Sequence, residues 1–415
     1  MKLSRTLTSV MATDSKERNI VIVGGGIIGC TTAYFLTRHP SFNPSLHKIV
    51  ILEATAIASG ASGKAGGLLA LWAYPSSIVP LSYNLHAELA KEHDGAQRWG
   101  YRTLHCGSIS ARGRNYHAHS HGSETKGNKA EWQKLPKTNR RGALQGLPKD
   151  LDWFDDSIIS YAEMGTPSTT AQVHPYLFTT SMADLAIGAG AEVTLGSVTA
   201  IDHADGVKSV TYQDKATKST HTLPATDVIL AAGPWTRHVF PAAPIDAMRA
   251  HSVVVKADVS PWAVFSEIEL PQDFGGGGQG RKHGMVVAPE MYARPDGTVY
   301  ACGEGDTLVP LPRTSDLVAC DEEKCDDITA YCGSISTAMR EGPVLTRQAC
   351  YLPSVSRGGG PLIGPTGIQG LLMATGHTCW GIQNSCATGK LMSEFVFEGR
   401  AKSAQVQGLD PRRFL

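Results

Sequence analysis

The sequence predicts an α/β protein in which a doubly wound parallel sheet is joined to an inserted α+β part on a mostly antiparallel sheet. Residues 19–23 form a run that is apolar and β-branched after Asn19 and is typical of a buried parallel strand, and residues 48–52 form a second apolar strand after Lys48. A glycine-rich turn and a helical segment lie between them. Residues 248–305 contain shorter runs separated by turn sequences such as that at 295–297, which favour antiparallel strands.

The turn after the first strand has the spacing G-x-G-x-x-G, from Gly24 to Gly29. Gly24 permits a tight turn, Gly26 lets the backbone approach a pyrophosphate, and Gly29 lets the helix pack closely on the strand. Ile27 and Ile28 begin the helix, where free N–H groups and a partial positive charge suit phosphates. The turn and its flanking elements therefore predict a Rossmann-like dinucleotide site.

An acidic residue closes the second strand, and a small polar loop follows it. Glu53 lies 24 residues after Gly29, where a carboxylate can accept both ribose hydroxyls of an adenosine. Ala54 follows it where an arginine would favour a 2′-phosphate, so FAD or NAD is favoured over NADP. The loop is suited to lie against a ring system or a phosphate rather than to act as a flexible linker. Its candidate cofactor-binding residues are Ser59, Ser62, Lys64, Gly66, Gly67 and Leu68.

These segments together resemble the FAD-binding half of the D-amino-acid-oxidase-like flavoproteins, a family that includes glycine and sarcosine oxidases. The resemblance covers most of the chain and is closest to fungal members of unassigned substrate. It implies that Val198 contacts adenine, that a second glycine turn lies beside the FAD, and that a late turn places a helix N-terminus at the pyrimidine edge of the flavin. The residues of these two turns are Ala232, Gly233 and Trp235, and Gly376, His377, Gly381 and Ile382.

The resemblance also implies a division of the chain into two domains. The FAD-binding domain is discontinuous, and the substrate domain is inserted between its pieces, so that substrate lies between an antiparallel sheet and the flavin. The expected FAD-binding pieces are residues 19–75, 165–236 and 345–410, and the expected substrate-domain pieces are residues 76–164 and 237–344.

The implied reaction is oxidation of a C–N bond in an amine or amino acid. A hydride passes from the carbon beside the nitrogen to flavin N5, and the imine that forms is hydrolysed. Oxygen, giving hydrogen peroxide, or another acceptor then reoxidises the flavin. His377 lies either at the reactive edge of the flavin or in a purely structural turn. The candidate catalytic residues are His377, Trp380, Arg294 and Tyr292.

The sequence departs from the family pattern at two neighbouring positions. Amino-acid-specific relatives usually carry an arginine that clamps the substrate carboxylate, and here that position is Leu352. Either Arg294 or Lys64 replaces it, or the substrate has no carboxylate. Cys350 lies near the cysteine that binds flavin covalently in sarcosine oxidases, so it is either a covalent attachment point or an ordinary buried cysteine.

Composition restricts the class of protein further. The 415 residues carry no net charge, which gives no reason to expect a nucleic-acid partner. No apolar run approaches the ~20 residues that span a bilayer. The nine cysteines are scattered and favour an intracellular, reducing compartment. The cytoplasm is expected, with a mitochondrion or a peroxisome as the alternatives. Residues 1–18 are expected to be a disordered extension, and no metal site is expected, because His117, His119 and His121 are more typical of a solvated loop.

Two alternatives remain at the level of sequence. One is a nicotinamide-dependent dehydrogenase that uses the Rossmann unit alone, which the loop at residues 59–67 and the late return to the cofactor disfavour. The other is a flavin-containing interaction or trafficking module whose catalysis is weak or lost, as Leu352 would allow.

Overall fold

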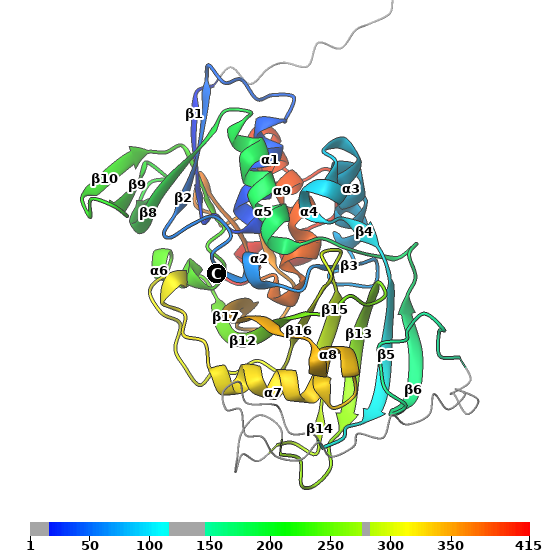
Figure 1. Cartoon of the computed structure of the whole chain (residues 1–415). Coiled ribbons are helices and arrows are strands. Elements are labelled where there is room, and N and C mark those ends of the chain that lie inside the picture. The colour runs from blue at the N-terminus through cyan, green and yellow to red at the C-terminus, as the bar shows by residue number, and fades with distance from the viewer. Residues whose placement is uncertain (1–15, 116–145, 276–282) are drawn as a thin grey trace, which may run out of the picture.

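The computed structural model describes residues 16–115, 146–275 and 283–415 (Figure 1). In these ranges the chain forms two eight-stranded sheets and a small three-stranded one. Most of the expected N-terminal extension, and also His117, His119 and His121, lie outside the described residues. The predicted α/β class is confirmed.

The first sheet contains five parallel strands at its centre and antiparallel strands at both edges. Its strands come from widely separated parts of the chain, because a parallel neighbour can be reached only by a crossover connection. In spatial order they are β10 (Thr220–Pro224), β9 (Ser209–Asp214), β8 (Ala191–Asp202), β2 (His47–Glu53), β1 (Arg18–Val23), β11 (Asp227–Leu230), β19 (Leu371–Thr375) and β18 (Leu362–Pro365).

The two strands predicted at residues 19–23 and 48–52 are confirmed as β1 and β2, each within one residue at either end. Their apolar residues are buried on both faces of the sheet, which explains why the sequence shows a continuous apolar run and no alternation. The pair is in parallel register, with Ile20 opposite Ile49 and Ile22 opposite Ile51.

Residues 191–202 form one strand, β8, that has a different partner in each half. Its first half pairs in parallel with β2, and its second half pairs antiparallel with β9. A register shift between Val198 and Ala200 interrupts the ladder within the half that pairs with β9.

Helices cover the parallel strands, and α1, α5 and α9 lie together beside β1 and β2 (Figure 1). The backbones of α1 and α9 approach closely where Gly389 faces Thr31, and the Thr31 hydroxyl donates to the Ser385 carbonyl at 3.0 Å. The helices of this layer are α1 (Ile27–Thr37), α3 (Val79–Glu92), α4 (Gly95–Trp99), α5 (Pro175–Ile187) and α9 (Gly381–Glu398).

The second sheet is antiparallel, as predicted, except where β13 runs parallel to β5. Strand β14 (Val286–Val287) pairs with β13 off the main path. In spatial order the others are β17 (Val344–Val355), β12 (Ile245–Lys256), β16 (Thr298–Cys302), β15 (Glu290–Ala293), β13 (Trp262–Glu269), β5 (His105–Arg112) and β6 (Ile158–Gly165).

The chain passes from one large sheet to the other at places that the sequence did not indicate. Strand β17, from the stretch assigned to the FAD-binding domain, pairs with β12 of the second sheet. Two separate helices, Glu322–Gly333 and Thr337–Glu341, precede this strand, because Ser334 ends the first and Ser336 caps the second by accepting from the Met339 N–H. The division into domains stays a prediction.

The remaining elements are the strands of a small sheet and helices of at most 12 residues. They are β3 (Leu68–Ala70), β7 (Thr170–Gln172) and β4 (Arg102–Thr103) of the third sheet, the helices α2 (Ala61–Lys64), α6 (Thr236–Val239), α7 (Glu322–Gly333) and α8 (Thr337–Glu341), and the single-turn helices η1 (Gly233–Trp235), η2 (Ser315–Leu317), η3 (Thr378–Trp380), η4 (Gln407–Leu409) and η5 (Pro411–Arg413). Within the described ranges, every helix is too short or too polar to cross a lipid bilayer.

We expect Gly389→Ala to destabilise the fold. A Cβ atom at this position would lie 2.6 Å from the Thr31 carbonyl carbon, so α1 and α9 would have to separate. Such overpacking costs about 1–3 kcal/mol of unfolding free energy, measurable by chemical denaturation. Gly188→Ala is the matched control, because a Cβ there meets only ordinary contacts. Equal stability of the two variants would contradict the close approach.

We also expect stability to fall as pH falls below neutrality. Burial lowers the pKa of His86 to about 4 and that of His377 to about 3, so the unfolded chain binds protons that the folded chain does not. Between about pH 6.5 and about pH 5 this difference removes roughly 2 kcal/mol of unfolding free energy per histidine. His86→Gln should flatten the pH dependence, measured by denaturation at several pH values. The exposed His221, changed to Gln, should leave the slope unaltered.

Candidate functional site

A cavity lies at the carboxyl ends of the parallel strands, where ligands of open α/β sheets usually bind. Its wall begins at the end of β1 and the start of α1, continues through the end of β2, and passes the middle of β8 and the end of β11. Residues 313–315, 352–353, 374–375, 377–379 and 381–382 also line it. The cavity thus gathers the beginning, middle and end of the chain.

Fifteen of the predicted cofactor-binding residues line this cavity, and seven do not. Those on the wall are Gly24, Gly26, Ile27, Ile28, Glu53, Ala54, Ser59, Ser62, Val198, Ala232, Gly233, Trp235, His377, Gly381 and Ile382. Those off the wall are Gly29, Lys64, Gly66, Gly67, Leu68, Cys350 and Gly376, and the candidates Tyr292, Arg294 and Trp380 are also absent from it.

The glycine turn permits backbone approaches that a side chain would prevent. Gly24 has a φ of +112°, and a Cβ there would lie 2.6 Å from the Ala231 carbonyl oxygen. A Cβ on Gly29 would lie 2.0 Å from the Gly24 carbonyl oxygen. Gly29 therefore lies off the wall because its task is to let α1 pack on the turn itself.

The start of α1 is open to an anion. Its N-cap residue, Gly26, offers no side-chain cap, and the first turn carries no acidic residue. The Ser62 hydroxyl accepts from one N–H of the first turn, that of Ile27, at 2.9 Å. The helix dipole still gives this end a partial positive charge at the cavity wall. This donor set fits a pyrophosphate.

The carboxylate of Glu53 is held firmly at the end of β2. One oxygen accepts from the Gly25 N–H at 2.7 Å, and the other accepts from the N–H of Thr55 at 2.8 Å and from its hydroxyl at 3.0 Å. These bonds fix the carboxylate beside the glycine turn and on the cavity wall, where it can accept the hydroxyls of a ribose.

Several predicted residues of the small loop hold the loop against the second sheet. Lys64 donates to the Ala349 carbonyl at 2.9 Å, and Arg294 donates to the Ala65 carbonyl at 3.1 Å. A Cβ on Gly66 would lie 2.3 Å from the ring of Tyr292. Both cations thus bond to backbone carbonyls in this structure. Their use as a clamp for a substrate carboxylate stays a prediction.

His377 is buried and uncharged at neutral pH. Its Nε2 is 3.0 Å from the Thr388 hydroxyl in α9, and burial lowers its pKa to about 3. The ring therefore connects the turn to the helix that follows, as expected if His377 has a purely structural role in the turn. Its contact with the cavity keeps a role beside the cofactor open.

Cys350 lies off the cavity wall, on β17. Its thiol is buried, and burial raises its pKa to about 11 against the opposing effect of Lys64. A protonated thiol is a poor nucleophile. The covalent link to flavin that the sequence suggested is not tested by this arrangement and stays a prediction.

The sequence did not indicate that an irregular segment at residues 303–321, here called the strap, reaches the cavity, where residues 313–315 line the wall. The Ser315 hydroxyl lies 2.6 Å from the hydroxyls of both Thr55 and Ser59, and the indole of Trp235 donates to the Pro312 carbonyl at 2.7 Å. Arg313 lines the cavity and brings a positive charge to it. The basic residue beside two hydroxyls was a visible signal, but nothing in the sequence linked this irregular segment to the first strand pair.

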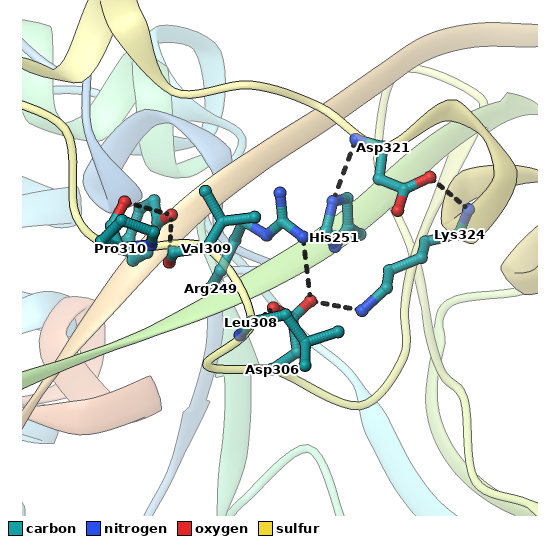
Figure 2. A network of polar contacts seen from close by, with 9 residues as sticks. Arg249, His251, Asp306, Leu308, Val309, Pro310, Asp321 and Lys324 are labelled. Atoms are coloured by element: carbon teal, nitrogen blue, oxygen red, sulfur yellow. Dashed lines mark hydrogen bonds and ion pairs between the residues drawn. The ribbon is translucent and has the colours of Figure 1, made fainter.

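Buried charges fix this strap to β12 and α7, and Figure 2 shows Asp306 between Arg249 and Lys324. Arg249 and Asp306 also exchange backbone hydrogen bonds of 2.8 and 2.7 Å. Burial alone would raise the pKa of Asp306, but the bonds from Lys324, from the Leu308 N–H and from Arg249 lower it to about 2. The carboxylate is therefore ionised at any physiological pH, and the strap keeps its position.

Comparison with known proteins agrees with this geometry. The DAO family, described as FAD dependent oxidoreductase, matches residues 19–395. Two fungal proteins with provisional names as oxidoreductases are similar over most of their length. TDA3 of Saccharomyces cerevisiae is 36% identical over 96% of this chain and 95% of its own, and C1F5.03c of Schizosaccharomyces pombe is 37% identical over 96% and 98%.

Solved structures share the fold at low sequence identity. Glycine oxidase from Bacillus cereus superposes with a TM-score of 0.67 at 19% identity, covering 96% of this chain and all of that one. L-proline dehydrogenase from P. horikoshii gives 0.67 at 17% identity, covering 96% and 98%. Both resemblances concern the fold alone.

We expect Glu53→Ala to weaken FAD binding. The change removes the acceptor of the Gly25 N–H and the carboxylate intended for the ribose. We expect the dissociation constant for FAD to rise at least roughly tenfold, which corresponds to about 1.4 kcal/mol. Fluorescence titration of the flavin-free protein would measure it. Glu192→Ala, an exposed change on the neighbouring strand β8, should leave the constant unaltered.

Proposed function

Since this chain belongs to the DAO family of FAD-dependent oxidoreductases, we propose that it oxidises the C–N bond of an amine or amino acid. A hydride would leave the carbon beside the nitrogen, an imine would form and hydrolyse, and oxygen would be reduced to hydrogen peroxide. The family assignment removes the nicotinamide-dependent alternative. The proposal is supported most directly by the single cavity that both Gly26 and Gly381 line.

The residues of the cavity fit FAD by their chemistry. The open start of α1 suits the pyrophosphate, and Glu53 suits the ribose. The start of α9 also lacks a side-chain cap and an acidic residue in its first turn. Its partial positive charge suits the electron-rich pyrimidine edge of an isoalloxazine. Bound FAD would supply the hydride acceptor, N5 of that ring.

The protein's own residues would then hold the cofactor in position and set the charge around it. His377 keeps the turn before α9 in place through Thr388 and remains neutral, so the α9 N-terminus rather than an imidazolium would stabilise negative charge. Arg313 would add a cation on the strap side of the cavity. Leu352, on the wall, contributes no charge for a substrate carboxylate.

We expect the purified protein to be yellow and its visible flavin absorbance to bleach when a suitable amine is added without oxygen. A panel of primary and secondary amines and amino acids, each mixed anaerobically with the protein, would find the substrate class. Admission of oxygen should restore the colour and release hydrogen peroxide. This result follows from hydride transfer to the flavin and its reoxidation.

A yellow protein that no member of the panel bleaches would contradict the proposal and favour the interaction or trafficking module. A colourless protein that takes up no FAD would contradict the cofactor assignment to the cavity. Acid precipitation of the same sample shows whether Cys350 is bonded to the flavin. A covalently bound flavin stays in the pellet, and a free flavin stays in solution.

A further inference from the structure

Aromatic rings of the second sheet touch the loop proposed to support the flavin. The rings of Tyr292 on β15 and Tyr300 on β16 are stacked, with centroids 5.9 Å apart. A Cβ on Gly66 would lie 2.3 Å from the first ring and 3.0 Å from the second. These strands lie next to the parallel-sheet half of the molecule (Figure 1). The face of β15 and β16 therefore adjoins the cofactor region directly.

An aromatic row continues from this face to the surface. Phe265 lies 6.0 Å from Tyr292 and 6.0 Å from Trp72, while Trp380 lies 5.4 Å from Trp72 and 5.9 Å from Tyr74. Exposure rises along the row from 6% at Tyr292 through 37% at Trp72 to 52% at Tyr74. Trp380 stands in the chain between two cavity-lining residues, so the row runs beside the cavity.

A carboxylate without a charged partner lies in this row. Glu290 is partly buried and accepts the hydroxyl of Tyr292, and the Cys302 thiol lies 3.9 Å away. In the described part of the chain, no ion pair involves Glu290. Arg294, two residues further along, donates instead to the Ala65 carbonyl and lies over the ring of Tyr300.

An uncompensated carboxylate in apolar surroundings is costly unless a cation joins it. Aromatic faces attract cations, and an ammonium group near several rings gains from each of them. A second carboxylate brought in by a substrate would be repelled, and neither Glu290 nor Leu352 could bind it. The row therefore combines attraction for a cationic nitrogen with rejection of an amino-acid carboxylate.

We propose that Glu290, with the rings of Trp72, Phe265, Tyr292 and Trp380, binds the ammonium group of an amine substrate that lacks a carboxylate. This inference rests on the proposed function, since it names the substrate class of the same enzyme. Burial also raises the pKa of Glu290. The carboxylate could accordingly take the ammonium proton, with the N–H electron pair remaining on nitrogen, before the hydride leaves.

The test uses the FAD-loaded protein and three probes that differ in one property each. Tetramethylammonium is a cation that cannot be oxidised, tert-butanol is its neutral counterpart, and glycine betaine adds a carboxylate. Quenching of tryptophan fluorescence, checked by calorimetry, would report binding without turnover. We expect tetramethylammonium to bind at least roughly tenfold more tightly than either of the others.

Glu290→Gln should weaken tetramethylammonium binding at least roughly tenfold, while Glu267→Gln, an exposed change on β13, should not. If Glu290→Gln fails to fold, Trp380→Leu provides the second variant and should weaken binding in the same direction. Equal binding of betaine and tetramethylammonium, or unaltered binding by both variants, would overturn the inference.

The outcomes separate this inference from the proposed function. Bleaching of the flavin by amino acids, with no binding of tetramethylammonium, would refute the substrate class and leave amine oxidation intact. Binding of tetramethylammonium that depends on Glu290, with no amine able to bleach the flavin, would refute the oxidation and leave the cation site intact.

Discussion

The contact between α1 and α9 is the constraint on which the cavity depends. At Thr31 and Gly389 the two backbones meet with no side chain between them. Both helices begin at the cavity, one after Gly26 and the other at Gly381, so this contact sets the separation of two positively polarised helix ends. A ligand with negative charge at two separated places is what such a pair can hold.

A second constraint joins the two large sheets through the small loop. Lys64 donates to β17, and Arg294 donates from the end of β15 to the loop backbone. Gly66 allows the rings of β15 and β16 to contact the loop. Movement of the second sheet would therefore move the loop, which ties the expected position of substrate to that of the cofactor.

The charges of the site are distributed between backbone and side chains. Helix ends and Arg313 supply positive potential, while His377 stays neutral because burial disfavours its cation. Asp306 stays ionised because two cations and a backbone N–H bond to it, and it holds the strap that brings Arg313 to the cavity. Each charge is thus either compensated within the protein or directed at the cavity, except that of Glu290.

The sequence by itself determined the α/β class, the first strand–turn–helix unit and fifteen of the residues on the cavity wall. These features depend on local rules: glycines where no Cβ fits, a buried apolar run, and an acid at a strand end. It also indicated that Leu352 departs from the family's arginine. It did not show that Lys64 and Arg294 bond to backbone carbonyls, because those partners lie far away in the chain.

Only the tertiary structure decided the rest. Four features depend on which segments meet in space. They are the two partners of strand β8, the division between α7 and α8, the position of the strap at residues 303–321, and the carboxylate of Glu290 without a charged partner. A sequence pattern reports the burial of a residue and the period of its neighbours. It does not report which distant donor or ring lies opposite, and that pairing fixes the chemistry of this site.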